Sequence, residues 1–177
     1  PWVETGNWTP TDLARDLTHT QCGFLVTETS YREQLDAAPA HALGARLQVT
    51  DDASFAATIA RFRGAQPGPA APAPAAPFCL IFTSGTSGAP KAVIYSHARV
   101  LRNSAMLVER QQMSRRDVTY VPMPLFHSSG LLMGLLPPLI AGGAAVLRRR
   151  FSASGFLADV RRYGVTMFCY VGKPLAY

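Results

Sequence analysis

A short polar stretch near the middle of the chain carries residue types that bind phosphate groups. Residues 83–88 have the sequence TSGTSG and follow an apolar run, FCLIF; Lys91 comes three residues later. Glycine lets the backbone turn several N–H groups towards one anion, and the threonine and serine hydroxyls add further donors. Lysine adds a positive charge on a long side chain, which suits a polyphosphate. We therefore predict a phosphate-binding loop.

Two other interpretations of this stretch fit less well. The Walker loop has the pattern G-x-x-x-x-G-K-[ST], but counted from Gly85 its second glycine is replaced by Pro90 and its final hydroxyl residue by Ala92. A flexible Ser/Gly linker is not expected to start at an apolar run and to end at a single lysine. The sequence favours a phosphate loop of another kind.

The segments on either side of this loop alternate between helical and strand patterns. The sequence TPTD predicts a helix start with Thr9 as N-cap, Pro10 in the first turn and Asp12 as the acid of a capping box. Later helices are expected at residues 30–38, 52–63, 96–113 and 152–164, and strands at residues 22–28, 47–50, 78–83, 118–121 and 165–171. This alternation predicts an α/β fold with a parallel sheet flanked by helices.

A segment rich in proline and alanine divides the chain. Residues 65–77 have the sequence AQPGPAAPAPAAP, a composition that forms no core and predicts an extended, mobile linker. We expect it to separate an N-terminal α/β piece, residues 1–64, from a region at residues 78–177 that contains the phosphate loop.

Composition and cysteine usage indicate a globular, reduced protein. The chain has 177 residues, which is about the length of one domain. It is 48% hydrophobic and 16% charged, a composition typical of globular proteins. Cys22, Cys79 and Cys169 are widely spaced beside apolar neighbours, so we expect reduced thiols in a cytoplasmic protein. Residues 130–147 carry no charge, but Pro137-Pro138 within them favour a buried helix, a turn and a strand over a membrane span.

The net positive charge of the chain does not by itself indicate that it binds nucleic acid. The net charge is +6, and arginines gather at residues 148–150 and 161–162. The sequence has no zinc-finger spacing, no helix-turn-helix signature and no run of aromatic residues interleaved with the basic ones, as a stacking platform would need. We expect the arginines to form a solvated rim; contact with ligand phosphates or with an anionic membrane surface is the open alternative.

Two blocks of sequence resemble a known enzyme family. The string TSGTSGAPKAV resembles the phosphate-binding signature of the adenylate-forming superfamily. The stretch from PMPLFHSSGLL to the segment FSASGFLADVRRYG is similar to the long-chain and very-long-chain fatty acyl-CoA synthetase branch, which includes the fatty acid transport proteins. The resemblance covers residues 78–177, and it is weaker over residues 1–64.

This resemblance implies a two-step ligase. In that family a fatty acid and Mg²⁺-ATP give an acyl-adenylate and pyrophosphate, and the thiol of CoA then displaces AMP. Lys91 is expected to act on the phosphates and His127 at the junction between acyl group and nucleotide. The implied nucleotide-binding residues are Thr83, Ser84, Gly85, Thr86, Ser87, Gly88 and Lys91.

Several alternatives stay open at this stage. A single histidine such as His127 is often a hydrogen-bonded core residue, and the apolar residues 131–133 suit either a core or an acyl pocket. The family's adenine-binding and ribose-binding blocks and its mobile C-terminal domain are not found before Tyr177. We therefore expect an N-terminal fragment that is inactive alone, with a non-catalytic remnant and a nucleic-acid module as alternatives and with peripheral membrane association left open.

Overall fold

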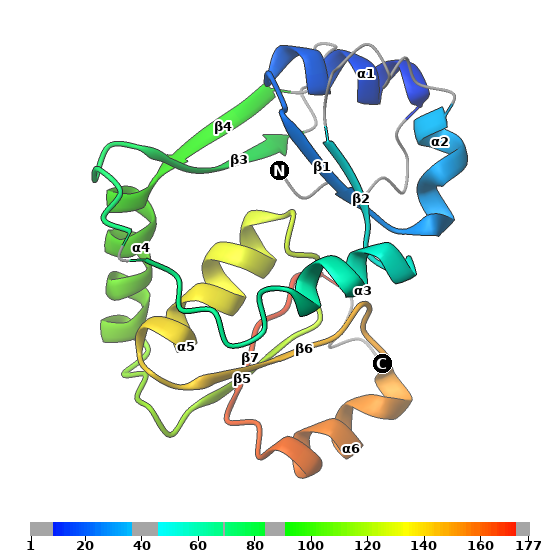
Figure 1. Ribbon diagram of the computed structural model, residues 1–177. Coiled ribbons are helices and arrows are strands. Elements are labelled where there is room, and N and C mark those ends of the chain that lie inside the picture. Colours follow the sequence, from blue (N-terminus) through cyan, green and yellow to red (C-terminus); the bar gives the residue numbers. More distant parts are fainter. Residues whose placement is uncertain (1–8, 37–45, 69, 84–90, 173–177) are drawn as a thin grey trace. The chain divides into compact units, whose positions relative to one another are not determined.

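The computed structural model describes residues 9–36, 46–68, 70–83 and 91–172. The chain divides into two compact units, and the division falls between Ala70 and Ala71, within the Pro/Ala-rich segment. Figure 1 shows the helices and strands of both units.

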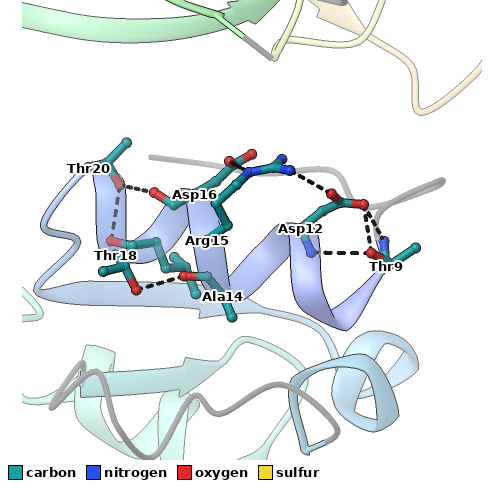
Figure 2. Close-up of polar contacts among 8 residues, drawn as sticks. Thr9, Asp12, Ala14, Arg15, Asp16, Thr18 and Thr20 are labelled. Carbon is teal, nitrogen blue, oxygen red and sulfur yellow. Dashed lines mark hydrogen bonds and ion pairs between the residues drawn. The ribbon is translucent and has the colours of Figure 1, made fainter. Parts of the chain in front are cut away.

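The first unit begins with helix α1 (Pro10–His19), whose start is fixed by the predicted capping box. The Thr9 hydroxyl oxygen accepts the Asp12 N–H at 3.2 Å, and the Asp12 carboxylate accepts the Thr9 hydroxyl at 2.6 Å. Arg15 donates to Asp12 and to Asp16, as Figure 2 shows. These local bonds confirm the expected helix start.

A pair of parallel strands completes the first unit. Strand β1 (Phe24–Thr27) pairs in parallel with β2 (Arg46–Val49). The remaining elements are η1 (Thr29–Tyr31), α2 (Arg32–Asp36) and α3 (Ala53–Ala60). The core of this unit consists of Leu13, Leu17, Cys22, Leu25 and Leu35. The helix expected at residues 52–63 is shorter than predicted, because Asp52 is its N-cap and a turn follows Ala60.

The second unit begins with an antiparallel hairpin. Strand β3 (Pro77–Thr83) pairs with β4 (Lys91–Ser96), and Leu80 lies opposite Ile94. The apolar run at residues 78–82 is only partly buried: Ile81 is buried, but Phe78 is 40% exposed. The hairpin is a two-stranded sheet, and Ile94 on β4 is 60% exposed.

The end of the Pro/Ala-rich segment is part of this fold. Pro77 is the first residue of β3. The carbonyls of Pro74 and Ala76 accept the N–H groups of Ala98 and His97 at 2.9 and 3.1 Å. The prediction of a mobile linker over the whole of residues 65–77 is therefore wrong at its C-terminal end, because these bonds tie that end to a helix.

A three-stranded parallel sheet in the same unit has β5 (Val118–Val121) at its centre. Strands β6 (Ala144–Leu147) and β7 (Met167–Phe168) flank it. Helix α6 (Ala153–Tyr163) starts at the N-cap Ser152 and ends at Gly164, whose φ is 61°. Both ends agree with the sequence prediction, and the parallel pairs confirm the predicted α/β class.

Three helical segments lie between β4 and β6 along the chain: the first joins β4 to β5, and the other two join β5 to β6. They are α4 (His97–Arg110), the π-helix η3 (Ser129–Leu135) and α5 (Leu136–Ile140). Ile81, Val100 and Leu132 form a buried cluster, and Cys79, Tyr95, Leu131 and Leu136 pack against it. Within the described ranges, no helix has the length and apolar character needed to cross a membrane.

Candidate functional site

The two strands of the hairpin bring the ends of the predicted phosphate loop together. The loop residues Ser84, Gly85, Thr86, Ser87 and Gly88 lie outside the described residues. The backbones of Thr83 and Lys91, which border them, are direct partners across the β3–β4 ladder. Directly opposed residues in such a ladder have Cα atoms about 5 Å apart. Lys91 is exposed and starts β4, a strand that the sequence analysis did not anticipate.

The strands that lead into the loop are anchored in the core of the second unit. Ile81, two residues before Thr83, is 7% exposed and packs with Val100 and Leu132. Cys79 and Tyr95 pack against the same cluster, and burial raises the pKa of the Cys79 thiol. The loop ends are thus held by the same packing that holds the π-helix.

His127 lies in a tight turn just before that π-helix. Its N–H donates to the Pro124 carbonyl oxygen at 3.2 Å, and its own carbonyl accepts the N–H groups of Gly130 and Leu131, both at 3.1 Å. The imidazole is exposed and tilts against the Phe126 ring, with 4.3 Å between centroids. Among the described residues, the His127 side chain is therefore not part of a core.

The apolar residues that follow His127 divide into two kinds. Leu132 is buried in the cluster with Ile81 and Val100, and Leu131 packs against that cluster. Met133 is 55% exposed. Leu132 is therefore a core residue, and Met133 is the residue of this run whose side chain is accessible to a ligand.

An ionic network supports the central strand that leads towards His127. The Tyr120 hydroxyl donates to the Asp159 carboxylate at 3.0 Å, and Arg148 Nε donates to the same oxygen at 2.8 Å. A second guanidinium nitrogen of Arg148 also bonds to Asp159. These donors, Arg148 foremost, lower the pKa of Asp159, whereas burial is the main reason why the pKa of Tyr120 is raised.

This network adds residues that the sequence analysis missed. Arg148 is exposed, as expected of a solvated rim, and it also forms an ion pair with a buried carboxylate. The available signal was Asp159 itself, which lies three residues after Phe156 and next to Val160 on the apolar side of α6. An acid in that position predicts a buried partner, because buried charges are paired.

The described residues contain no group of three or more histidine, cysteine, aspartate or glutamate side chains that could hold a metal ion. Thr119 on β5 and Ser104 on α4 are buried, but threonine and serine are not among these four residue types. This region places Lys91 at the end of the predicted phosphate loop. The turn that exposes the His127 imidazole packs on the same core.

Comparison with known proteins decides the family. The model of the AMP-binding enzyme family matches residues 5–175. The chain belongs to this family. The match includes both units and every site residue named above, so the resemblance of the phosphate-loop and histidine blocks extends to the N-terminal region.

Two of the relatives are named as a CoA ligase and a CoA synthetase. The chain is 44% identical over 165 residues to the medium/long-chain-fatty-acid–CoA ligase FadD17 of Mycobacterium marinum, covering 93% of this chain and 31% of that protein. It is 39% identical over 168 residues to the steroid-22-oyl-CoA synthetase of Rhodococcus jostii, covering 94% and 30%. The chain therefore spans about a third of the length of these relatives.

A solved structure of the family has a similar fold. The o-succinylbenzoate CoA synthetase of Bacillus subtilis, in complex with its acyl-adenylate intermediate, superposes with a TM-score of 0.77 at 25% identity. The superposition covers 98% of this chain and 43% of that enzyme. The α/β architecture described above is thus the architecture of the corresponding part of an AMP-binding enzyme.

Proposed function

We propose that the protein to which this chain belongs is an AMP-forming fatty acyl-CoA ligase. A fatty acid carboxylate attacks the α-phosphate of ATP, giving the acyl-adenylate and pyrophosphate. The thiol of CoA then attacks the acyl carbon and AMP leaves. Mg²⁺ is proposed to enter as the complex with the substrate ATP.

The observation that carries this proposal is the placement of two family motifs on one packed core. The Thr83–Lys91 pair borders the phosphate loop, and the His127 turn precedes the π-helix whose Leu132 packs against Ile81 of the same hairpin. A ligase of this kind must hold ATP phosphates and an acyl carboxylate near each other, since proximity and orientation supply much of the rate.

The roles follow from the chemistry of the side chains. Charge develops on the transferred phosphate and on the leaving pyrophosphate, and preorganised N–H groups, hydroxyls and a lysine stabilise it. We assign this role to the loop and to Lys91. His127, as an exposed imidazole, is assigned to orient the acyl carboxylate or adenylate. The loop residues in this assignment are Thr83, Ser84, Gly85, Thr86, Ser87 and Gly88.

A long-chain fatty acid is the proposed acyl substrate, and the cytoplasm the proposed location. The relative from Mycobacterium marinum is named for medium and long-chain fatty acids, and it is 44% identical. Cys22, Cys79 and Cys169 are free thiols, which fits a reducing compartment. Peripheral contact with a membrane remains part of the proposal because the substrate partitions into lipid.

Acyl-dependent exchange of pyrophosphate into ATP tests the proposal in the complete protein. Wild type should catalyse exchange with long-chain fatty acids, and Lys91→Ala should lower kcat/KM for ATP by about tenfold or more, which corresponds to about 1.4 kcal/mol of lost transition-state stabilisation. Arg110→Ala is the matched control, because Arg110 is an exposed cation in the last turn of α4. It should leave exchange unchanged.

Two outcomes would contradict parts of this scheme. Wild type without exchange for any fatty acid would favour the non-catalytic remnant. Exchange that Lys91→Ala leaves at the level of Arg110→Ala would remove Lys91 from the phosphate site while keeping the ligase activity.

A further inference from the structure

The backbone on both sides of His127 is fixed by hydrogen bonds to its neighbours. The N–H of His127 bonds to the Pro124 carbonyl, and the carbonyl of His127 bonds to the N–H groups of Gly130 and Leu131. The position of the imidazole therefore depends on where the Pro124 carbonyl and the first residues of the π-helix lie.

Gly130 lies directly against that same Pro124 carbonyl. A Cβ at residue 130 would stand 2.2 Å from the Pro124 oxygen, 2.7 Å from its carbonyl carbon and 2.8 Å from the Met123 oxygen. Real Cβ atoms essentially never approach other atoms this closely, and all three atoms are backbone atoms that cannot rotate away. Any side chain at residue 130 must therefore displace the hydrogen-bond partner of His127.

The π-helix is held against the sheet at a second glycine. A Cβ on Gly134 would lie 2.8 Å from Val121 Cγ1. Between the two glycines, Leu132 is buried in the core, and the Cys169 thiol donates to the Ser129 carbonyl at 3.5 Å. These contacts allow little room for the helix to shift. π-Helical turns are uncommon and occur frequently at functional sites.

We propose that Gly130 is a positioning residue for the acyl substrate, acting through His127. This proposal rests on the proposed ligase function. Because a residue with no Cβ is required against the Pro124 carbonyl, Gly130 fixes the turn that presents the imidazole to the acyl carboxylate. The phosphates of ATP bind at a different segment, the loop after β3, so a change at residue 130 should affect acyl binding more than ATP binding.

Steady-state kinetics of the complete protein separate positioning from general damage. Gly130→Ala should raise KM for the fatty acid about tenfold while KM for ATP changes by less than about twofold. Gly143→Ala is the matched control: its Cβ would lie 2.5 Å from the Asp117 oxygen, at the opposite end of β5 from Pro124. Its clash is also with backbone oxygens, the next being that of Ser114 at 3.0 Å, but both of its KM values should stay within about twofold of wild type.

A spectroscopic measurement reports the turn independently of activity. With ¹³C-labelled histidine, the His127 ring resonance is assigned by its loss in His127→Asn. Gly130→Ala should shift this resonance, whereas Gly143→Ala should not. His97 is the internal reference, because its ring packs edge-on against Phe78 at 5.3 Å, away from the turn.

A second pair of variants covers the case in which Gly130→Ala does not fold. Gly134→Ala places its methyl group closest to the Val121 side chain, at 2.8 Å, and the nearest backbone atom, the Ser129 oxygen, is 3.3 Å away. It should therefore shift the His127 resonance and raise the fatty acid KM in the same direction by a smaller factor. Val121→Ala removes the opposing methyl groups, so the double variant should return both values towards wild type.

The outcomes distinguish this proposal from the function on which it rests. An unmoved His127 resonance in Gly130→Ala and in Gly134→Ala, or an equal rise of the fatty acid KM in Gly130→Ala and Gly143→Ala, overturns the positioning role and leaves the ligase function intact. Wild type without acyl-dependent exchange overturns both. A shift in the resonance together with a selective rise in the fatty acid KM supports both.

Discussion

The two residues predicted to contact substrate, His127 and Lys91, are attached to strands that differ in burial. His127 follows β5, the central strand of a parallel sheet, in which Thr119, Tyr120 and Val121 are all buried. Lys91 begins β4 of a two-stranded hairpin, where Ile94 is 60% exposed. Strand β5 is therefore packed on both faces, whereas β4 is packed on one.

This difference fits the two tasks proposed for Lys91 and His127. A polyphosphate is held by many donors at once, so a small displacement of one of them costs little. A single imidazole must be placed correctly by itself, and the strand before it is accordingly buried on both faces. If this comparison is right, substitutions in and around β5 should cost far more stability than substitutions in the hairpin.

The largest effect is expected for Tyr120→Ala. The Tyr120 side chain is 1% exposed, and its ring lies 5.3 Å from Phe156 and 5.8 Å from Phe168. Removing the ring should lower the free energy of unfolding by about 3–5 kcal/mol, measured by urea denaturation. Tyr120→Phe keeps the ring contacts and should lose only about 1 kcal/mol. Equal losses for both would show that the hydroxyl, and not the packed ring, stabilises β5.

The next effect depends on pH. Arg148 donates to Asp159 and holds the pKa of this carboxyl below its ordinary value. The folded chain therefore takes up a proton at Asp159 less readily than the unfolded chain, so this pair contributes stability above the unfolded pKa of about 3.9. That stability is lost as pH falls through the lower, folded pKa.

Replacing the carboxyl tests this linkage. Asp159→Asn should flatten the fall of Tm below about pH 4, because the group that takes up the proton is gone. Glu109→Gln, an exposed acid on α4, is the control and should keep the wild-type slope. If Tm falls with pH in Asp159→Asn as it does in wild type, other carboxyls account for the loss of stability at low pH.

A smaller loss of stability is expected for substitutions of Ser96, where β4 ends and α4 begins. The Ser96 hydroxyl oxygen accepts the Arg99 N–H at 3.3 Å and caps the helix. Ser96→Ala should lower the free energy of unfolding by about 1 kcal/mol, whereas Ser96→Gly should lose only about 0.3 kcal/mol. Both values come from urea denaturation. An alanine variant as stable as wild type would show that the cap adds nothing here.

The smallest effect is expected for Ile94→Ala on the exposed face of β4. Substitutions at such positions usually change the free energy of unfolding by less than about 0.5 kcal/mol. A loss near that of Tyr120→Ala in the complete protein would show that this face of the hairpin is covered in solution, and the contrast between β5 and β4 would fail.

The features that the sequence predicted correctly depend on residues close together in the chain. The capping box at Thr9 and the helix expected at residues 152–164 each rest on contacts within a few positions. The phosphate loop and the role of His127 were also inferred from local motifs, and they stay predictions. Such signals are complete within one short stretch of sequence.

The features that the sequence did not predict depend on partners that folding brings together. Strand β4 forms only because β3 lies opposite it across the loop. Arg148 and Asp159 are eleven positions apart, and they meet because β6 and α6 pack on β5. The approach of Gly130 to the Pro124 carbonyl is a backbone distance, and no residue pattern reports it.

The bonds between the Pro/Ala-rich segment and α4 have a consequence for where an anion is attracted. The N-terminus of a helix carries a partial positive charge and free N–H donors, which makes it an anion site by default. In α4 the N–H groups of His97, Ala98 and Arg99 are already bonded, to Ala76, Pro74 and Ser96.

That helix end also lies at the far end of the hairpin from Lys91, six residue steps or about 20 Å along β3. With its donors occupied, α4 does not compete for a polyphosphate. The C-terminal end of the Pro/Ala-rich segment thus occupies the N–H donors at one end of the hairpin, which fits the proposal that a nucleotide binds at the other end.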